Sequence, residues 1–354
     1  MKGLILSGGA GTRLRPITHT AAKQLVPVAN KPVLFYGLEA MKAAGIDAVG
    51  IVVGDTRDEI EAAVGDGSRF GLDVTYIPQE APLGLAHAVL ISEDFLGDEP
   101  FVMYLGDNLL KEGITPFVRG FEESRPDALI LLQKVTDPRS YGIAELDGEG
   151  NVARLVEKPS DPRSDLALVG VYLFTPAIFT SVKAIAPSER GELEITDAIQ
   201  HLVDRGLRVE PHVVTGWWKD TGKLEDMLEA NRLVLSTIAR DVRGDLVECT
   251  IEGAVQIGEG SRLERCTVRG PAVIGSGCRL TDTFVGPYTS ISDGVTVENA
   301  ELEHSIILEN SRISHLGTRM TDSLIGRDCV IAHSEARPVA YRFLVGDSCR
   351  IGIL

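Results

Sequence analysis

The stretch LSGGAGTRLRPIT, residues 6–18, places three glycines and two arginines directly behind the short apolar run 3–6. A glycine-rich loop after a buried strand lets the backbone come close to a phosphate, which its N–H groups can bind. This loop fits neither common phosphate motif. It lacks the Gly-Lys-Ser/Thr ending of a Walker loop, and Leu14 stands where a dinucleotide-binding loop needs its third glycine. The stretch therefore predicts an N-terminal strand that ends in a phosphate site of another kind.

Short apolar runs alternate with longer helical patterns up to about residue 235. The runs 3–6, 48–53, 74–77, 101–105, 128–132 and 168–174 predict strands, and 33–44, 57–64 and 85–91 predict helices. This alternation is typical of an α/β fold with a mainly parallel sheet covered on both faces. Because ligands bind such sheets at the carboxyl ends of the strands, we expect the glycine loop, Gln79 and Asp107 to meet in one crevice.

After about residue 245 the helical pattern gives way to a 17-residue repeat. Three apolar series share this step: Leu246, Leu263, Leu280 and Val297; Ile251, Val268, Val285 and Leu302; Ile257, Ile274, Ile291 and Leu308. Three inward positions per repeat predict a three-sided coil whose stacked turns bury one core. We therefore predict one domain over 1–240 and a repeat domain over 245–354, with a looser register beyond residue 302. Cys249 and Cys266, also 17 apart, are expected to stack in that core.

The composition of the 354-residue chain narrows the class of protein. The 35 Lys and Arg residues against 51 Asp and Glu give a net charge of −16, which argues against a nucleic-acid partner. No apolar run approaches the ~20 residues of a membrane-spanning helix. The N-terminus lacks a signal-peptide pattern, so we expect a cytoplasmic protein. The five cysteines lack the paired spacing of a zinc site and are expected to be reduced.

Charged side chains at the predicted strand ends suit a polyphosphate ligand. Fixed cations neutralise phosphate, and two carboxylates could hold Mg²⁺ on its oxygens. A sugar phosphate is mostly a dianion above its second pKa of ~6, so it needs no protein nucleophile, only positioning and charge. Each feature alone also has a structural interpretation as a turn, a cap or a solvated ion pair. The candidate residues are Arg13, Lys23, Asp107, Glu157, Lys158, Glu194 and Asp220.

Ordered motifs across the first two thirds of the chain resemble those of sugar-phosphate nucleotidyltransferases, most closely the long form of the glucose-1-phosphate thymidylyltransferases. The motifs are GGAGTRL (8–14), KQLVPVANKP (23–32), QEAPLGLAHA (79–88), LGDN (105–108), YGIAE (141–145), VEKP (156–159), GVYLF (170–174), RGELEITDA (190–198) and WWKDTG (217–222). The resemblance implies a Rossmann-like nucleotide-binding sheet followed by a left-handed parallel β-helix.

The resemblance also implies an activity. Such an enzyme joins dTTP and α-D-glucose 1-phosphate into dTDP-glucose for deoxysugar synthesis. The sugar phosphate attacks the α-phosphorus in line, with Mg²⁺, and pyrophosphate leaves; a homo-oligomer is expected. Three alternatives stay open: UTP or another sugar 1-phosphate as substrate, an added acyl-CoA transferase activity of the repeats, and a catalytically inactive sugar-nucleotide sensor. Because His304, His315 and His333 lie where the register loosens and show no orienting partner in the sequence, we expect the repeats to be structural.

Carried over position by position, the resemblance gives each residue a role. The catalytic residues are Arg13, Lys23, Asp107 and Lys158. Arg13 would stabilise charge at the α-phosphorus, and Lys158 would bind the sugar's phosphate. Asp107 and Asp220 would hold Mg²⁺, while Gln79 and Gly84 would read the pyrimidine edge. The other substrate-binding residues are Leu6, Gly8, Gly9, Gly11, Thr12, Gln24, Tyr141, Gly142, Glu157, Val169 and Glu194.

Overall fold

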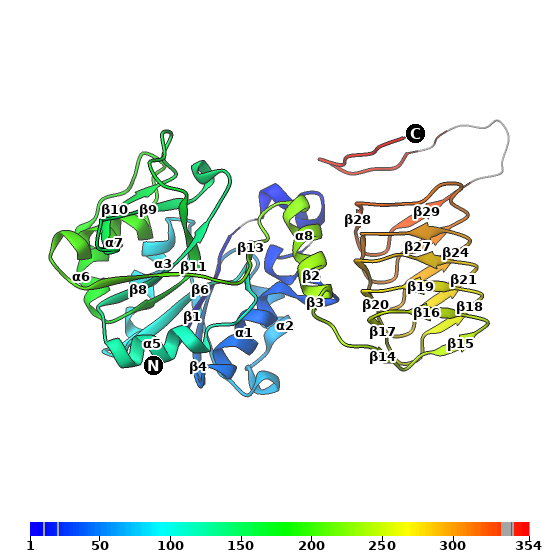
Figure 1. The fold of residues 1–354 in the computed structure, drawn as a ribbon, viewed down its shortest axis with the longest axis horizontal. Coiled ribbons are helices and arrows are strands. Elements are labelled where there is room, and N and C mark those ends of the chain that lie inside the picture. The colour runs from blue at the N-terminus through cyan, green and yellow to red at the C-terminus, as the bar shows by residue number, and fades with distance from the viewer. Residues whose placement is uncertain (10, 20, 334–340, 342, 354) are drawn as a thin grey trace. The chain divides into compact units, whose positions relative to one another are not determined.

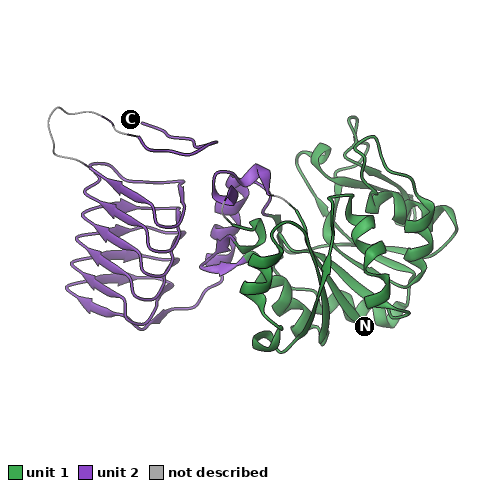
Figure 2. Ribbon diagram, turned by 180° about the vertical axis from the view of Figure 1, so that it is seen from behind, with its two compact units in different colours: residues 1–10, 21–25, 33–220 green, residues 11–20, 26–32, 221–354 purple. Residues whose placement is uncertain are grey.

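The computed structural model describes residues 1–9, 11–19, 21–333, 341 and 343–353. It forms two compact units (Figures 1 and 2), one of residues 1–10, 21–25 and 33–220, the other of residues 11–20, 26–32 and 221–354. This division differs from the predicted one at 240–245, because residues 221–240 and two N-terminal segments group with the repeats. Independent folding of residues 1–240 stays a prediction.

The first unit is built on a nine-stranded sheet in the order β10-β9-β11-β6-β1-β4-β5, with β8 beside β11 and β12 beside β8. Its strands are β1 (Lys2–Ser7), β4 (Ala48–Val53), β5 (Asp73–Pro78), β6 (Phe101–Leu105), β8 (Ala128–Lys134), β9 (Gly142–Leu146), β10 (Val152–Glu157), β11 (Leu166–Phe174) and β12 (Val209–Val213). The parallel Rossmann-like part, in which β1 lies between β4 and β6 and β5 follows β4, confirms the predicted fold class. Strand β11 runs antiparallel to β6, β8 and β9.

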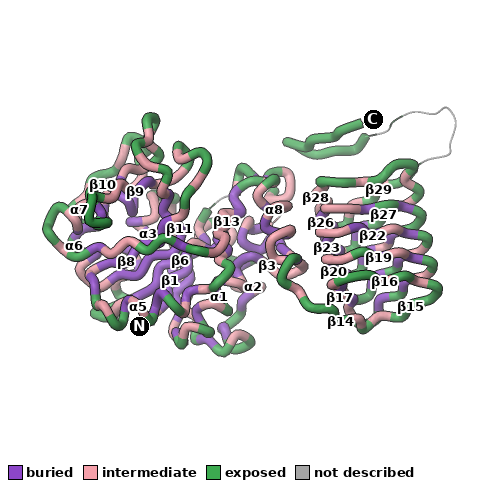
Figure 3. Tube along the Cα trace, in the orientation of Figure 1, coloured by how far each residue is buried: buried purple, intermediate pink, exposed green. Residues whose placement is uncertain are grey.

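Helices cover both faces of this sheet, so its central strands β1, β4, β6 and β11 are buried on both sides, whereas β5, β10 and β12 keep exposed residues (Figure 3). Leu4 and Leu6 of β1 belong to a core that includes residues of α3, α6 and α7. Ile5, which points to the opposite face, belongs to a second core with α1, α2 and α5. The helices are α1 (Val33–Ala43), α2 (Arg57–Val64), α3 (Leu85–Ile91), α4 (Glu93–Leu96), α5 (Thr115–Ser124), α6 (Ala177–Ala184) and α7 (Ile195–Asp204). The first three match the predicted helices.

Short elements complete the first unit. They are the 3-10 turns η3 (Lys23–Leu25), η4 (Ser68–Phe70) and η5 (Pro138–Ser140) and the small antiparallel sheet of β7 (Asn108–Leu110) and β13 (Trp218–Asp220). No helix among the described residues combines the length and the apolar character needed to cross a bilayer.

The second unit consists mainly of three parallel sheets. In each sheet, equivalent strands of successive repeats pair with one another, as the repeat predicts. Their orders are β14-β17-β20-β23-β26-β28, β15-β18-β21-β24-β27-β29 and β16-β19-β22-β25. The strands are β14 (Asp241–Val242), β15 (Asp245–Val247), β16 (Thr250–Glu252), β17 (Val255–Ile257), β18 (Arg262–Glu264), β19 (Thr267–Arg269), β20 (Ala272–Ile274), β21 (Arg279–Thr281), β22 (Phe284–Val285), β23 (Thr289–Ile291), β24 (Thr296–Glu298), β25 (Glu301–Leu302), β26 (Ile306–Ile307), β27 (Arg312–Ser314), β28 (Leu324–Ile325) and β29 (Val330–Ala332). Also in this unit are η1 (Thr12–Leu14), η2 (Ile17–His19), β2 (Pro27–Val28), β3 (Lys31–Pro32) and α8 (Leu224–Leu235).

The register confirms two of the three apolar series. Each residue of the Ile251 series pairs with the next along the stack, and so does each residue of the Leu246 series up to Val297. The third series was wrong at its last member, because Ile291 pairs with Ile307 rather than Leu308, a step of 16. Cys266 lies buried in the core, and its N–H donates to Sγ of Cys249 at 3.5 Å, so these two cysteines do stack.

A buried asparagine ties α8 to the repeats. Oδ1 of Asn231 accepts hydrogen bonds from the N–H of Ala29 at 2.8 Å and from Oγ of Ser290 at 2.6 Å. Its Nδ2 donates to the carbonyl of Tyr288 at 3.0 Å. Asn30 reaches the same sheet, where its Nδ2 donates to the carbonyl of Ile291 at 2.6 Å. These bonds explain why α8 and residues 26–32 group with the repeats.

Replacing Asn231 with alanine should lower the free energy of unfolding by about 3 kcal/mol, because the buried Ser290 hydroxyl and two half-buried backbone groups lose their partner at once. Urea unfolding of the full chain measures this change. Ser236→Ala, at the exposed end of the same helix, is the matched control and should stay within ~0.5 kcal/mol. Equal unfolding midpoints for the two variants would show that these bonds contribute nothing.

Candidate active site

Lys23 and Asp107 form an ion pair beside the glycine loop. Nζ of Lys23 contacts Oδ2 of Asp107, and the two side chains are only 15% and 13% exposed. Cε of Lys23 lies 3.0 Å from the position that a Cβ on Gly9 would occupy, so the absent side chain makes room for the lysine. The structure thus brings together three predicted residues: Gly9, which follows β1, Lys23 of η3, and Asp107, which follows β6. They lie past the carboxyl ends of two parallel strands.

The small sheet of β7 and β13 brings Asp220 to the same place. Asp220 pairs in register with Asn108, the residue after Asp107. Oδ1 of Asn108 accepts from Nε1 of Trp218 at 2.5 Å, and its Nδ2 donates to Oδ1 of Asp107 at 2.9 Å. The two predicted metal ligands, 113 residues apart in sequence, therefore lie close to each other at one end of this two-stranded sheet.

The charge state of Asp107 follows from its surroundings. Burial opposes its ionisation, but the ammonium of Lys23 and hydrogen bonds from Lys23 and Asn108 outweigh burial and hold the pKa of Asp107 below its ordinary value. An ionised carboxylate is the form that binds a hard cation. Within the described part of the chain, no three His, Cys, Asp or Glu side chains gather at metal-binding spacing. A cation held by Asp107 and Asp220 would take its other ligands from phosphate and water, as Mg²⁺ commonly does.

Gln79 reaches the start of the glycine loop from the end of β5. Its Oε1 lies 3.0 Å from the position that a Cβ on Gly8 would occupy, and its Nε2 donates to the carbonyl of Gly84 at 3.4 Å. Gly84 has a φ of 102° and packs against the backbone of Leu193, whose N lies 2.7 Å from the position of a Cβ. Only glycine fits there, so this turn holds Gln79 and Gly84 close together, as predicted.

A second charged cluster forms at the hairpin of β9 and β10. Gly142 pairs with Glu157, and Oε2 of Glu157 lies 3.0 Å from the position of a Cβ on Gly142. Oε1 of Glu157 lies 3.1 Å from Nζ of Lys158. Nη1 of Arg190 is 3.5 Å from Oε1 of Glu157 and 3.2 Å from Oε1 of Glu194. The predicted residues for sugar and phosphate thus meet, and Arg190 joins them.

The two glutamates of this second cluster are held by hydrogen bonds, and their surroundings shift the pKa of Glu194. Burial raises the pKa of Glu194, and the negative charge of Glu157 raises it further, although a hydrogen bond from Ser188 opposes the shift. Oγ1 of Thr196 donates to Oε2 of Glu157 at 3.1 Å. Carboxylate oxygens held in this way present fixed acceptors to a polyhydroxylated ligand.

Tyr141 connects the two clusters. Its ring meets the ring of Trp218 edge to face, with centroids 5.5 Å apart, and its carbonyl accepts from the N–H of Lys158 at 3.0 Å. Because Trp218 in turn donates to Asn108, a continuous line of contacts runs from the Lys158 backbone to the carboxylate of Asp107. The two charged clusters are therefore connected by contacts within the first unit, and together they form the candidate site.

Other predicted residues have different surroundings. Gly11, Thr12 and Arg13 belong to the second compact unit, where Gly11 has a φ of 63° and Arg13 is exposed. Leu6 and Val169 are buried core residues, so any ligand contact of theirs would use the backbone. Ala10, inside the predicted loop, lies outside the described residues.

Gln24 is 1% exposed, and its Oε1 finds no hydrogen-bond partner among the residues that the structure describes. A buried acceptor without a donor costs about 1–3 kcal/mol. A ligand that supplies the donor would remove this cost, which fits the predicted binding role of Gln24.

Three residues that the sequence analysis did not single out complete the site. Asn108 and Trp218 support the two aspartates, and Thr196 supports Glu157. All three lie inside the quoted motifs LGDN, WWKDTG and RGELEITDA. Their place beside charged residues was the available signal, but a contact between side chains 110 residues apart leaves no pattern in one sequence.

Two histidines of the repeats have polar partners, contrary to expectation: Nδ1 of the exposed His315 lies 3.4 Å from Nδ2 of Asn299, and His304 contacts a carboxylate. Nδ1 of His304 lies 2.5 Å from Oδ1 of Asp322. Nε2 of His304 is buried and finds no hydrogen-bond partner in the described part of the chain. A general base must present that nitrogen to its substrate, so this pair does not support an acyl-transfer site.

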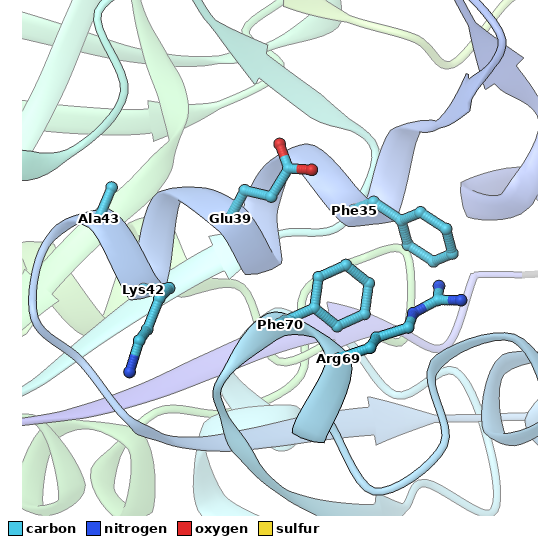
Figure 4. A pocket seen from close by; sticks show the side chains of 6 residues that line it. All are labelled: Phe35, Glu39, Lys42, Ala43, Arg69 and Phe70. Atoms are coloured by element: carbon cyan, nitrogen blue, oxygen red, sulfur yellow. The ribbon is translucent and has the colours of Figure 1, made fainter.

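A pocket of about 620 Å³ lies between α1 and η4 (Figure 4) and is lined by Phe35, Glu39, Lys42, Ala43, Arg69 and Phe70. The guanidinium of Arg69 lies 4.3 Å and 4.5 Å from the ring centroids of Phe35 and Phe70. None of the predicted site residues lines this pocket, so we assign it no part in the reaction.

Known proteins show which family this chain resembles. The nucleotidyl transferase family model matches residues 2–237. Glucose-1-phosphate thymidylyltransferases of Streptomyces antibioticus and Streptomyces griseus are 55% and 57% identical, each covering 100% of this chain and 99% of its own length. A Bacillus anthracis protein assigned as the same enzyme, solved in complex with a sucrose, superimposes with a TM-score of 0.62 at 36% identity and covers 66% of this chain and 94% of its own. Because the family model matches residues 2–237 and the two Streptomyces enzymes match over the full length, the chain belongs to the nucleotidyl transferase family.

Proposed function

We propose that this protein joins dTTP and α-D-glucose 1-phosphate to give dTDP-glucose and pyrophosphate. The observation that carries the proposal is the single site with two charged clusters, Lys23 with Asp107 at the glycine loop and Glu157 with Lys158 at the β9–β10 hairpin. A reaction between two phosphorylated substrates needs two such subsites. The similar enzymes of the two Streptomyces species act, by their names, on glucose 1-phosphate and a thymidine nucleotide.

In this proposal the first cluster binds the nucleoside triphosphate. Backbone N–H groups of the loop at Gly8 and Gly9 approach its phosphates, with Gly11 and Thr12 continuing the loop. Lys23 and Arg13 neutralise its charge, and Gln79 faces its base. A phosphate oxygen of the sugar phosphate forms a bond to the α-phosphorus as the bond to the β-phosphate oxygen breaks. Pyrophosphate leaves with that bonding pair, so no proton transfer to the protein is required.

The second cluster binds the sugar phosphate. Lys158 pairs with its phosphate, while Glu157 and Glu194 accept hydrogen bonds from its hydroxyl groups. Arg190 bridges these two carboxylates and keeps them at a fixed spacing. Orientation of the attacking oxygen against the α-phosphorus supplies much of the rate acceleration in a reaction of this type.

A divalent cation, Mg²⁺ in this proposal, fits the pair Asp107 and Asp220. When bound there it would offset negative charge on the phosphate oxygens. Lys23 already contacts Asp107, so the lysine would shift toward phosphate when a cation takes that carboxylate. Homo-oligomer formation and a cytoplasmic location stay predictions.

A pyrophosphate-release assay over a matrix of nucleoside triphosphates and sugar 1-phosphates tests the function. We expect kcat/KM for dTTP to exceed that for dATP and dGTP by at least ~10³, because a purine leaves buried polar groups unpaired. UTP, which lacks one methyl group and has a 2′-hydroxyl, should stay within about 100-fold of dTTP. Efficient turnover of GTP would contradict the proposal.

Two other functions are separated by the same assay. A better rate with UTP or with another sugar 1-phosphate would keep the chemistry and change the substrate. Binding of nucleotides with no pyrophosphate released from any pair would indicate a sensor. The presence of the whole set assigned to the chemistry favours the enzyme over a sensor: Arg13, Lys23, Asp107, Lys158 and Asp220.

A further inference from the structure

His87 lies directly beside the glutamine that faces the nucleotide base in the proposed function. Nδ1 of His87 is 3.0 Å from Nε2 of Gln79. His87 comes from the first turn of α3, which begins at the residue after Gly84. Both side chains are half-buried. A neutral imidazole and a primary amide at this distance share one hydrogen bond, and its direction decides which way the amide faces.

The neighbouring carbonyl settles that direction. The amide group of Gln79 also approaches the carbonyl oxygen of Gly84 at 3.4 Å, and a backbone carbonyl can only accept. The amide nitrogen must therefore lie on this side and donate to both neighbours. It follows that Nδ1 of His87 is the unprotonated ring nitrogen and accepts.

The amide oxygen then faces the opposite way, toward the glycine loop. Oε1 of Gln79 lies 3.0 Å from the position that a Cβ on Gly8 would occupy. Thymine and uracil carry a hydrogen on N3 and match an acceptor in this place. Cytosine has a lone pair on N3 and would need the amide nitrogen there instead. A half-turn of the amide group would therefore exchange one base preference for the other.

We propose that His87 is a positioning residue that holds the amide of Gln79 with its oxygen toward the base and so selects thymine or uracil over cytosine. The proposal rests on the base-reading role of Gln79 in the proposed function. In this role His87 touches no substrate. Its effect appears as a ratio between two nucleotides rather than as a general loss of activity.

The test compares kcat/KM for dTTP and dCTP, each with glucose 1-phosphate, in the full-length protein. His87→Leu keeps the volume and removes the acceptor, so the dTTP/dCTP ratio should fall about 10-fold, the equivalent of one hydrogen bond. His87→Asn places a carbonyl oxygen near the position of Nδ1 and should keep the ratio within ~3-fold of the unmodified protein. His201→Ala is the matched control, because this half-buried histidine bonds Ser181 instead, and its ratio should not change.

The outcomes separate this inference from the proposed function. An unchanged ratio in His87→Leu, with both rates lowered equally, would overturn the inference and leave the proposed function intact. If the leucine variant does not fold, His87→Ala gives the same readout. Gln79→Ala should lower the ratio at least as much as His87→Leu, and an unchanged ratio there would also overturn the inference. No turnover of any pyrimidine nucleotide by the unmodified protein would instead refute the proposed function.

Discussion

Replacing Asp107 with asparagine should lower kcat by at least ~100-fold, the equivalent of roughly 3 kcal/mol for one preorganised electrostatic contact. The change keeps the size of the side chain and removes its charge, so a cation loses one of its two carboxylates. Lys23 also loses the partner that it contacts in the structure. The measurement is steady-state pyrophosphate release at saturating Mg²⁺ and substrates.

Asp282→Asn is the matched control for this variant. Asp282 also forms an ion pair, with Oδ1 2.6 Å from Nε of Arg265, but on the exposed surface of the repeats. Its loss should leave kcat unchanged, so the comparison separates the loss of an ion pair from the loss of a catalytic charge. Near-full activity of Asp107→Asn would contradict the metal assignment.

The second large effect is expected at Arg13. Arg13→Ala should lower kcat by about 100-fold, because the transition-state charge at the α-phosphorus loses a cation, while the KM for glucose 1-phosphate stays within ~3-fold.

Lys158→Ala should affect binding of the sugar phosphate rather than kcat. It should raise the KM for glucose 1-phosphate about 10-fold, as expected for one hydrogen bond to a charged group, with little change for dTTP. Initial rates with each substrate varied in turn give both sets of constants.

Equal effects of both variants on both substrates would mean that the two phosphate subsites are assigned wrongly. Arg163→Ala serves as a control for the removal of a positive side chain, because Arg163 lies on the chain between the predicted site residues Lys158 and Val169 and has no assigned role. Its kinetic constants should match those of the unmodified protein.

Much of the fold could be predicted because burial leaves a periodic record in the sequence. The apolar runs around Leu4 and Ile51 appear as buried strands, and the 17-residue step appears as the register of the repeats. The direction of a strand leaves no such record, so nothing in the run 168–174 distinguished the antiparallel β11 from its parallel neighbours. The change from a 17-residue to a 16-residue step at Ile307 could not be predicted either, because Ile307 and Leu308 are both apolar.

The sequence indicated which charged residues lie together in the candidate site, but not the residues that hydrogen-bond to them. Lys23, Asp107 and Glu157 stand in motifs with a chemical meaning, and the structure brings each to a neighbour that the motifs named. The bond from Trp218 to Asn108 joins residues 110 positions apart, so it depends on the folded chain. The same holds for the grouping of α8 with the repeats, which follows from the buried contacts of Asn231.

The bond between Asn30 and Ile291 has a consequence for synthesis of the chain on the ribosome. The two residues are 261 positions apart, and translation at about 5–20 residues per second adds that length in roughly 10 to 50 s. Throughout this interval residues 26–32 have been synthesised, but the sheet that Asn30 contacts has not. Final ordering of a segment near the N-terminus therefore waits for one of the last parts of the chain to be translated.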